Sequence, residues 1–249
     1  MDAIEGADRL LFELASADRL IIMTEIQKEP LKLSQVARRH SATVQETFRQ
    51  LERLAKAQLI EKNPSGAYDL TSLGKEALSL VRSFGFLARE KEFVLDHDLT
   101  SIPRGYHERI GELLSARRVD HLDDVLDAEE RIIRESREYV WFMTDQMFGH
   151  PSHQPHRDQI ERVSMRLLLP HGLDPGPLLR DLRPLGVEPE VRFVDRVNAA
   201  MVLSEKMAAL AFPSLDGRLD YGRGFVGDSE EFHEWCLDLY SHYWAKAEG

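Results

Sequence analysis

The chain has a single cysteine, Cys236, among its 249 residues. One cysteine excludes an internal disulfide and a zinc site built on cysteine pairs, so a reducing compartment is expected. No run of about 18 uncharged apolar residues occurs, which argues against a membrane-spanning helix. The charges spaced through residues 1–20 argue against a signal peptide. We therefore expect a cytoplasmic protein that has no membrane partner.

Motifs of common enzyme chemistry are also missing. The sequence has no phosphate loop of the G-x-x-x-x-G-K form, no G-x-S-x-G nucleophile elbow and no H-E-x-x-H zinc pair. Its histidines are scattered, and none has an obvious nucleophile partner. We therefore expect no catalytic residues, no cofactor and no enzyme activity.

Positive charge is scarce overall but unevenly distributed. The net charge is -11, yet residues 1–93 hold 14 Lys+Arg and 14 Asp+Glu, whereas residues 94–249 hold 18 and 29. Residues 32–62 carry a local excess of four positive charges. The length of the chain favours two domains, and the charge distribution predicts that an anionic partner binds the N-terminal one.

Helical spacing of apolar residues predicts two helices within residues 6–27. The break lies near Ser16, which is expected to cap the second helix, with Arg19 on its outer face. Ser34 is predicted to cap a short third helix over residues 35–40.

Further capping signals follow along the chain. Thr43 and Glu46 have the spacing of a capping box, which predicts a fourth helix ending near residue 57. Two short strands, residues 59–61 and 67–70, are predicted on either side of a turn. Thr71 is expected to cap the helix that follows.

This order of elements, carried by "LSQVARRHSATVQETFRQLERLAKAQLIEKNPSGAYDLTSLGKEAL", resembles the winged helix-turn-helix of prokaryotic transcription regulators, especially ArsR-like and archaeal ones. Val36 and Ala37 match the apolar-plus-small pair of the motif's first helix. Thr47, Leu51 and Leu54 match the inward positions of its recognition helix. Ser41 stands where many relatives have glycine. The resemblance implies a DNA-binding fold, a homodimer and double-stranded DNA as partner.

The stretch "FVLDHDLTSIPRGYHERIGELL" resembles the segment between the two domains of archaeal regulators of the methanogenesis-regulator (FilR) type. The alternating pattern after it predicts strands at 118–122, 139–143, 164–169, 190–194, 199–203 and 207–212, and helices at 123–136, 157–162, 177–182 and 228–246. The expected fold class is α+β, with an N-terminal winged helix-turn-helix and a C-terminal mixed α/β sensor domain. The expected boundaries are 1–80 for the DNA-binding domain, 81–116 for linker and dimerisation helices, and 117–249 for the effector-sensing domain.

The basic helix pair is the candidate DNA-binding surface. An ordinary solvated face is the alternative, but the wing and the capping box favour DNA, because a helix in the major groove needs donors for phosphates and base edges. Gln45 is suited to adenine and Arg49 to guanine. The predicted DNA contacts are Thr43, Gln45, Arg49, Gln50, Arg53, Lys56, Lys62 and Ser65.

The stretch "HPSHQPH", residues 150–156, places three histidines in one loop. A metal site is one interpretation, but two prolines oppose a single helical face. The loop follows the strand at residues 139–143, and ligands of open α/β sheets lie at the carboxyl edge of strands. We therefore expect a small-molecule effector to bind there, although aromatic residues on a strand are often core. The predicted effector residues are Trp141, Met143, Asp145, His150, Ser152 and His153.

Together these patterns predict a transcriptional regulator that binds operator DNA as a homodimer and responds to an effector. Two alternatives remain at this point: a winged helix used for protein-protein contacts, and a metabolic enzyme. Sensor domains of related archaeal regulators have been likened to the phospholipase D fold, whose chemistry needs a histidine and a lysine two residues apart. The corresponding stretch here, "NAAMVLSEK", has no histidine.

Overall fold

The computed structural model describes residues 3–146 and 163–249. The chain forms two compact units, residues 1–84 and 85–249. The long helix α5 runs through the boundary between them. Among the residues that the structure describes, no helix has both the length and the apolar composition needed to cross a bilayer.

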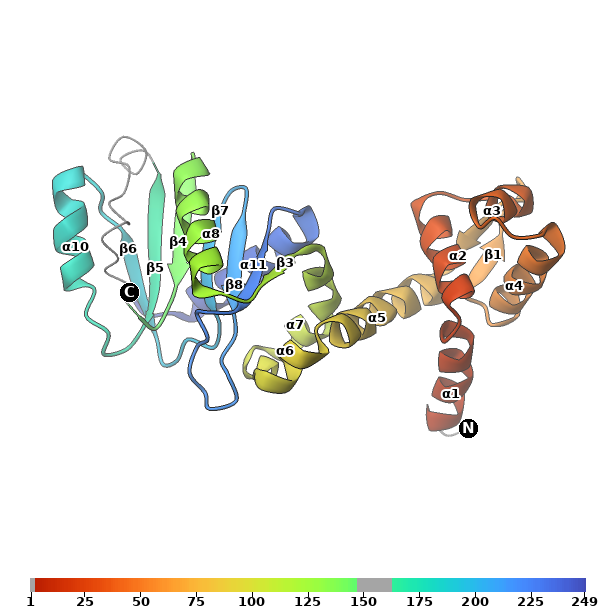
Figure 1. Cartoon of the computed structure of the whole chain (residues 1–249), viewed down its shortest axis with the longest axis horizontal. Coiled ribbons are helices and arrows are strands. Elements are labelled where there is room, and N and C mark those ends of the chain that lie inside the picture. The colour runs from red at the N-terminus through yellow and green to blue at the C-terminus, as the bar shows by residue number, and fades with distance from the viewer. Residues whose placement is uncertain (1–2, 147–162) are drawn as a thin grey trace. The chain divides into compact units, whose positions relative to one another are not determined.

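The N-terminal unit is a winged helix-turn-helix (Figure 1, red to orange). Strands β1 and β2 form an antiparallel hairpin, with Glu61 opposite Asp69. The order of elements agrees with the order predicted from the sequence. The elements are α1 (Ala3–Leu14), α2 (Ala17–Lys28), α3 (Leu33–Arg39), α4 (Val44–Lys56), β1 (Ile60–Lys62), β2 (Tyr68–Leu70) and α5 (Ser72–Arg89).

One hydrophobic core joins the helices of this unit to the hairpin. The predicted inward residues Thr47, Leu51 and Leu54 of α4 are buried, as are Val36 and Ala37 of α3. Burial of this apolar face supplies most of the stability of such short helices, because isolated helices of their length are marginal in water.

One capping prediction and one burial prediction were wrong, and the prediction for Ser16 holds in its position only. Ser16 occupies the N-cap position of α2, but its side chain makes no capping hydrogen bond. Lys32, and not Ser34, is the N-cap of α3, since the Gln35 side chain accepts a hydrogen bond from the Lys32 amide. Arg19 is buried, with 6% of its surface exposed, because it finds hydrogen-bond acceptors inside the unit.

Two backbone positions shape the motif. Ser41, in the turn between α3 and α4, has a φ of 51°. A Cβ disfavours this left-handed conformation, so glycine would adopt it at lower cost. Gly74 lies in the first turn of α5, and a Cβ built on it would lie 1.9 Å from the carbonyl oxygen of Leu59. The start of α5 can therefore approach the hairpin this closely only with glycine.

The second unit is built on a mixed sheet of seven strands in the described residues. The strand order is β3-β9-β8-β7-β4-β5-β6; β4, β5 and β6 are parallel, and the other neighbours are antiparallel. The strands are β3 (Arg117–Val119), β4 (Tyr139–Met143), β5 (Ser164–Pro170), β6 (Glu190–Val194), β7 (Ala200–Ser204), β8 (Ala208–Ala211) and β9 (Gly224–Gly227).

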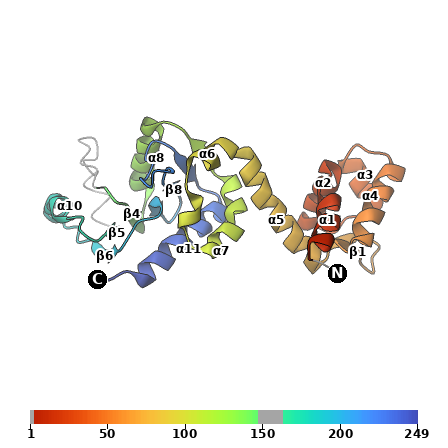
Figure 2. The ribbon, with the colours of Figure 1, turned by 90° about the horizontal axis from the view of Figure 1, so that it is seen from below.

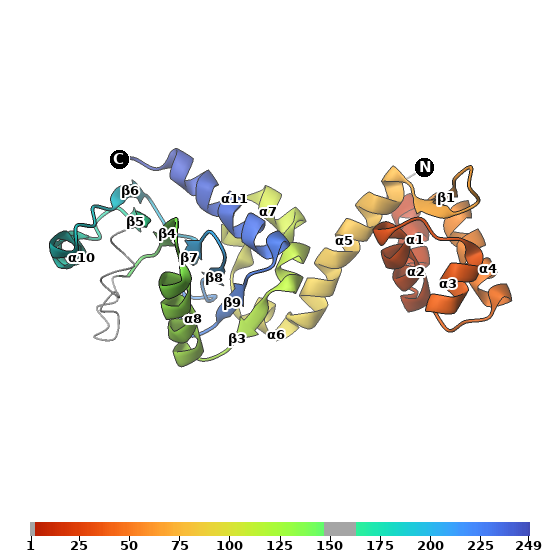
Figure 3. The same ribbon diagram turned by 90° about the horizontal axis from the view of Figure 1, so that it is seen from above.

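Helices cover both faces of this sheet, α8 on one and α11 on the other (Figures 2 and 3). Val125 and Ile132 of α8 pack on one side, and Trp235 and Tyr240 of α11 belong to the larger core on the other. The helices of the unit after α5 are α6 (Lys91–Asp96), η1 (Leu99–Ser101), α7 (Arg104–Glu108), η2 (Ile110–Ser115), α8 (Leu122–Glu135), α10 (Gly176–Leu182), η3 (Arg183–Leu185) and α11 (Glu230–Lys246).

Most predicted elements of this unit are confirmed, with small differences at their ends. The first strand begins one residue earlier than predicted, at Arg117, and ends at Val119. Strand β9 was missed, because its sequence "GFVG" is rich in glycine, which weakens the strand signal. The helix predicted at 157–162 lies outside the described residues.

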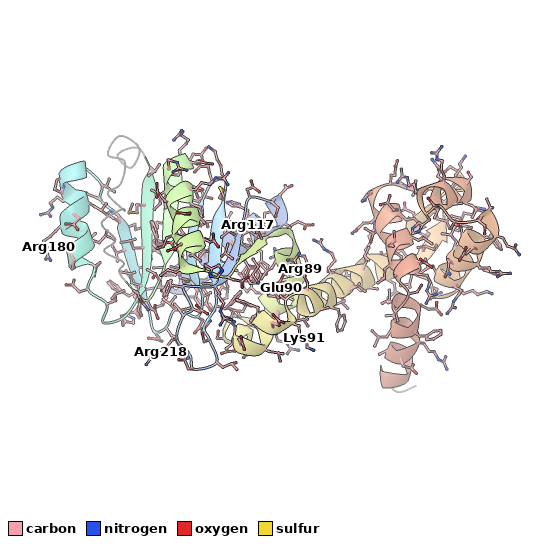
Figure 4. All side chains as sticks on the ribbon, viewed as in Figure 1. Arg89, Glu90, Lys91, Arg117, Arg180 and Arg218 are labelled. Carbon is pink, nitrogen blue, oxygen red and sulfur yellow. The ribbon has the colours of Figure 1, made fainter. Side chains whose placement is uncertain are left out.

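The predicted linker, residues 81–116, contributes to the core of the second unit. Phe86, Phe93 and Leu113 are buried there. Glu90, buried at the junction of α5 and α6, forms ion pairs with Arg89 and Arg118. Figure 4 marks Arg89 and Glu90 at this junction. These residues therefore have a structural role in addition to connecting the two units.

The end of α6 is tied to the loop between β8 and β9. His97 is buried, with Nδ1 2.8 Å from the Phe93 carbonyl oxygen and Nε2 3.1 Å from an Asp220 carboxylate oxygen. Burial alone would raise the pKa of Asp220, but hydrogen bonds from Arg223, the Gly222 amide and His97 lower it.

The two outer strands of the sheet have different surroundings. Phe193 of β6 exchanges two backbone hydrogen bonds with Glu248, near the end of the chain. Strand β3 has only three residues, and two of them, Arg117 and Arg118, are charged. Neither outer strand presents a long apolar edge.

Replacing Gly74 by alanine is expected to destabilise the winged helix by at least about 2 kcal/mol, because the new Cβ collides with backbone and not with a flexible side chain. Helix propensity alone predicts the opposite sign, a gain of about 1 kcal/mol. Urea denaturation of the whole chain measures the change. Gly105→Ala is the matched control, since nothing lies within 4 Å of its added Cβ. A stabilised Gly74→Ala variant would contradict the close approach.

Candidate nucleic-acid interface

One stripe of α4 faces solvent, opposite the stripe that enters the core. Gln45, Arg49 and Lys56 are exposed, and helical periodicity places them on the side opposite Thr47, Leu51 and Leu54. Among the described residues, the side chains of Gln45 and Arg49 make no hydrogen bond or ion pair. The two residues predicted to read bases therefore have their donors available.

The N-terminus of α4 is capped as predicted. The Thr43 hydroxyl accepts a hydrogen bond of 3.2 Å from the Glu46 amide. Thr47 donates its own hydroxyl to the Thr43 carbonyl oxygen at 3.0 Å. The cap fixes the first turn of the helix, whose free amides and dipole favour anions. Val44 and Phe48 are also exposed, so this end of the helix offers apolar as well as polar contacts.

Two of the predicted DNA contacts on α4 are bound by residues of α1 or α2. Arg53 forms a bidentate ion pair with Glu13 of α1, with N···O distances of 2.8 and 3.1 Å. Gln50 accepts a hydrogen bond of 3.2 Å from Arg19 through its side-chain oxygen. These two side chains lie on the flank of α4 that faces α1 and α2, beside the outward stripe.

The other cationic side chains of α3 and α4 also fall into two groups, those with an ion-pair partner and those without a recorded one. Arg39 of α3 pairs with Glu25 and Glu29, and Lys56 pairs with Glu52 at 3.2 Å. Arg38 is exposed, and no ion pair is recorded for it within the described part of the chain. Arg38 was not among the predicted contacts, although its position before the turn to α4 could have indicated it.

The wing is organised by a residue that the sequence prediction did not single out. The Asn63 side-chain oxygen accepts hydrogen bonds from the Ser65 amide, the Ser65 hydroxyl and the Ala67 amide. Ser65 therefore uses both of its donors inside the turn. Lys62 is exposed, and its Nζ lies 5.6 Å from the centre of the Tyr68 ring, where it can still reach an anion.

Arg19 and Glu13 are the functional candidates that sequence reasoning missed. Arg19 donates to the carbonyl oxygens of Phe12 and Glu13 at 2.9 and 2.6 Å. Its guanidinium also lies 3.3 Å from the Glu13 carboxylate. Hydrogen bonding from Arg53 is the main cause that lowers the pKa of Glu13. In the sequence, the one local indication that Arg19 is buried is its place beside the apolar run Leu20 to Ile22.

The carboxyl edge of the parallel strands in the second unit is described only in part. Met143 is fully buried in the core, and the ring of Trp141 stacks on Tyr139 and Tyr240. Asp145 accepts a hydrogen bond of 2.7 Å from the Tyr221 hydroxyl. The other predicted effector residues, His150, Ser152 and His153, lie outside the described residues. The effector site therefore stays a prediction.

Other site types find little support in this unit. Within residues 3–146 and 163–249, no group of three or more His, Cys, Asp or Glu is placed to hold a metal ion. The sequence "GRGFVG", residues 222–227, has the glycine spacing of a dinucleotide-binding loop, but it leads into β9 and not into a helix. A Cβ on Gly224 would lie 2.3 Å from the Leu210 carbonyl oxygen, so close strand packing explains this glycine.

No family model and no curated protein matches the chain. Among solved structures, it is similar to TrmBL2, an archaeal chromatin protein with a novel mode of DNA binding, at 14% identity and a TM-score of 0.42 over 93% of this chain and 92% of that one. It is also similar to NucT from Helicobacter pylori, at 13% identity and a TM-score of 0.39 over 51% and 92% of the two chains. An IclR-family regulator from Rhodococcus sp. matches at 14% identity and a TM-score of 0.26 over 93% and 88%. At these scores the likenesses establish no function.

Proposed function

We propose that this chain is a DNA-binding transcriptional regulator. The observation that carries the proposal is the outward stripe of α4, where Gln45 and Arg49 are exposed on a helix whose other side is packed in the core. Glutamine can form two hydrogen bonds with the edge of adenine, and arginine with that of guanine. Lys62 on the wing adds a cation suited to the phosphate backbone.

The charge distribution supports contact through the N-terminal unit. Residues 94–249 hold 29 Asp+Glu against 18 Lys+Arg, so phosphate repels the second unit. Residues 32–62 hold the local positive excess. DNA is therefore expected to approach the face that carries α4 and the wing.

We propose further that the chain acts as a homodimer through α5. Leu73, Ala77, Leu80, Phe84 and Leu87 follow the alternating four- and three-residue spacing of a coiled-coil seam. All except Ala77 are exposed, by 42% to 60%. A second copy supplies the same stripe, as a two-fold interface requires. A dimer also suits the palindromic half-sites that helix-turn-helix proteins read. The exposed Leu11 and Phe12 of α1 are a second candidate surface for the partner copy.

We propose that a small-molecule effector binds the second unit at the carboxyl edge of its parallel strands. β4, β5 and β6 end at this edge, and Asp145 lies two residues after the end of β4. Open α/β sheets bind ligands at such edges. An effector shifts the regulator between two states only if it binds one of them better.

We propose finally that the second unit binds its ligand without catalysing a reaction. In the stretch likened to a phospholipase D motif, Lys206 donates to the Glu135 carbonyl oxygen at 3.1 Å. The Glu205 carboxylate accepts hydrogen bonds from the amides of Arg137 and Glu138 at the start of β4. Lys206 thus binds the end of α8, and Glu205 binds the segment between α8 and β4.

Arg49→Ala and Gln45→Ala are each expected to weaken specific DNA binding by about 1–3 kcal/mol, because each removes a base-edge contact. Lys62→Ala should weaken binding to all sequences equally and lower the salt slope by about 0.9. A mobility-shift titration with DNA from upstream of the chain's own gene, at two salt concentrations, measures both. Arg180→Ala, exposed on α10 (Figure 4), is the charge-matched control. Wild-type binding by all three variants would refute the interface.

The double variant Leu80→Glu with Phe84→Glu is expected to be monomeric, because paired carboxylates repel one another within an apolar seam. Sedimentation equilibrium measures the change in mass, and circular dichroism checks that the helices persist. Leu215→Glu is the control, since Leu215 is 69% exposed and lies outside α5. A double variant that remains dimeric would place the interface elsewhere.

Trp141→Ala and His150→Ala are expected to abolish the response to effector without changing DNA binding in its absence. Compounds that raise the melting temperature of the chain supply the ligands for the test, since binding to the folded state stabilises it. The Trp141 fluorescence change is isolated by subtracting the Trp141→Phe signal, because Trp235 is fully buried and replacing it would disturb the core. Retention of the full response by both variants would exclude this edge.

A further inference from the structure

Arg53 is held by α1 rather than left free beside the outward stripe of α4. Its Nε and one Nη donate to the two carboxylate oxygens of Glu13 at 3.1 and 2.8 Å. This two-point geometry is the arrangement that guanidinium also adopts with a phosphate group. The guanidinium carbon lies 5.3 Å from the centre of the exposed Phe12 ring. The Glu13 carboxylate thus occupies the donors that a DNA phosphate would use.

The two ends of this ion pair differ in how firmly they are held. Glu13 contacts Arg19 as well, at 3.3 Å, and the Arg19 side chain is only 7% exposed. Arg19 is in turn fixed by two carbonyl oxygens of α1 and by Gln50. The Arg53 side chain is 43% exposed. When the pair opens, Glu13 keeps a cationic partner, and Arg53 is the group that can turn to solvent.

We propose that Glu13 is an internal competitor of DNA phosphate for Arg53, so that α1 lowers the affinity of the interface. The inference rests on the proposed function, since it concerns the same surface. In the free protein the guanidinium binds the carboxylate. On DNA it must leave Glu13 to reach the backbone, and the strength of the ion pair is subtracted from the binding free energy. Any event that moves α1 away from α4 then strengthens DNA binding.

The size of the effect follows from the exposure of the pair. An exposed ion pair is worth at most a factor of about five in an equilibrium constant. Because Arg19 remains beside Glu13, breaking the pair does not leave an isolated buried charge. Glu13 therefore tunes the affinity and does not switch it off.

Glu13→Gln in the full chain tests the proposal by mobility-shift titration on the upstream DNA. The variant is expected to bind about two- to fivefold tighter than wild type, and Glu13→Ala, which removes the acceptor altogether, at least as much. In an Arg53→Ala background the same Glu13 substitutions should give no gain. The double variant Glu13→Gln with Arg53→Ala should show a salt slope lower by about 0.9 than Glu13→Gln alone, since one phosphate contact is lost.

Glu76→Gln is the charge control. Glu76 is exposed on α5 in the same unit, and no ion pair is recorded for it in the described residues. A gain from Glu13→Gln that equals the Glu76→Gln gain, or that persists without Arg53, would show only a change in net charge and would overturn the proposal. Weaker binding by Glu13→Gln, with an unchanged circular dichroism spectrum, would overturn it by showing that the pair positions Arg53 for DNA.

The outcomes separate this inference from the proposed function. If wild type binds DNA with a steep salt dependence and Arg49→Ala weakens it, the regulator proposal stands whatever Glu13 does. A silent Glu13→Gln then refutes the competition alone. If wild type does not bind the upstream DNA at any salt concentration, both proposals fall together.

Discussion

The packing of α4 against the core determines what the N-terminal unit can present to a partner. Thr47, Leu51 and Leu54 enter the core, and each further residue is rotated by about 100° around the helix axis. The side opposite them must carry Gln45 and Arg49. Rotating α4 by a single residue would move Leu51 and Leu54 to the exposed places of Glu52 and Ala55, at a cost of several kcal/mol. Burial of Thr47, Leu51 and Leu54 thus determines that Gln45 and Arg49 point to solvent.

Arg49 and Arg53 of α4 have different surroundings because their side chains point in slightly different directions around the helix axis. They are one helical turn apart, yet Arg49 has no recorded partner in the described residues and Arg53 is bound to Glu13. Four residues advance the helix by about 40° more than a full turn, and this offset brings Arg53 within reach of α1. Identical residue types at neighbouring positions therefore have different surroundings: Arg49 is open to an outside partner, and Arg53 is bound within the protein.

Much of the fold could be predicted from local signals. The Thr43 cap of α4, the turn at residues 63–66 and the alternating apolar residues of β4 each depend on residues close in sequence. The errors involve contacts that no local pattern contains. Arg19 is buried because it reaches Gln50, 31 residues away, and His97 is bonded to Asp220, 123 residues away.

The candidate interface was predictable in part for the same reason. The exposed pair Gln45 and Arg49 follows from helical periodicity and a recognised motif. The engagement of Arg53 by Glu13 does not, since it joins residues 40 apart. Strand β9 escaped prediction because Gly224 is required by close approach to Leu210, whereas glycine in a sequence normally indicates a turn.

The outer strands of the seven-stranded sheet affect how readily molecules of this protein aggregate at high concentration. An unpaired strand edge can template pairing with the edge of another molecule and so start aggregation. Here the backbone of Phe193 in β6 is already paired with Glu248, and β3 offers only three residues, two of them arginines. Each outer edge is therefore less open to strand addition, which favours contacts between molecules through helices over contacts through their sheets.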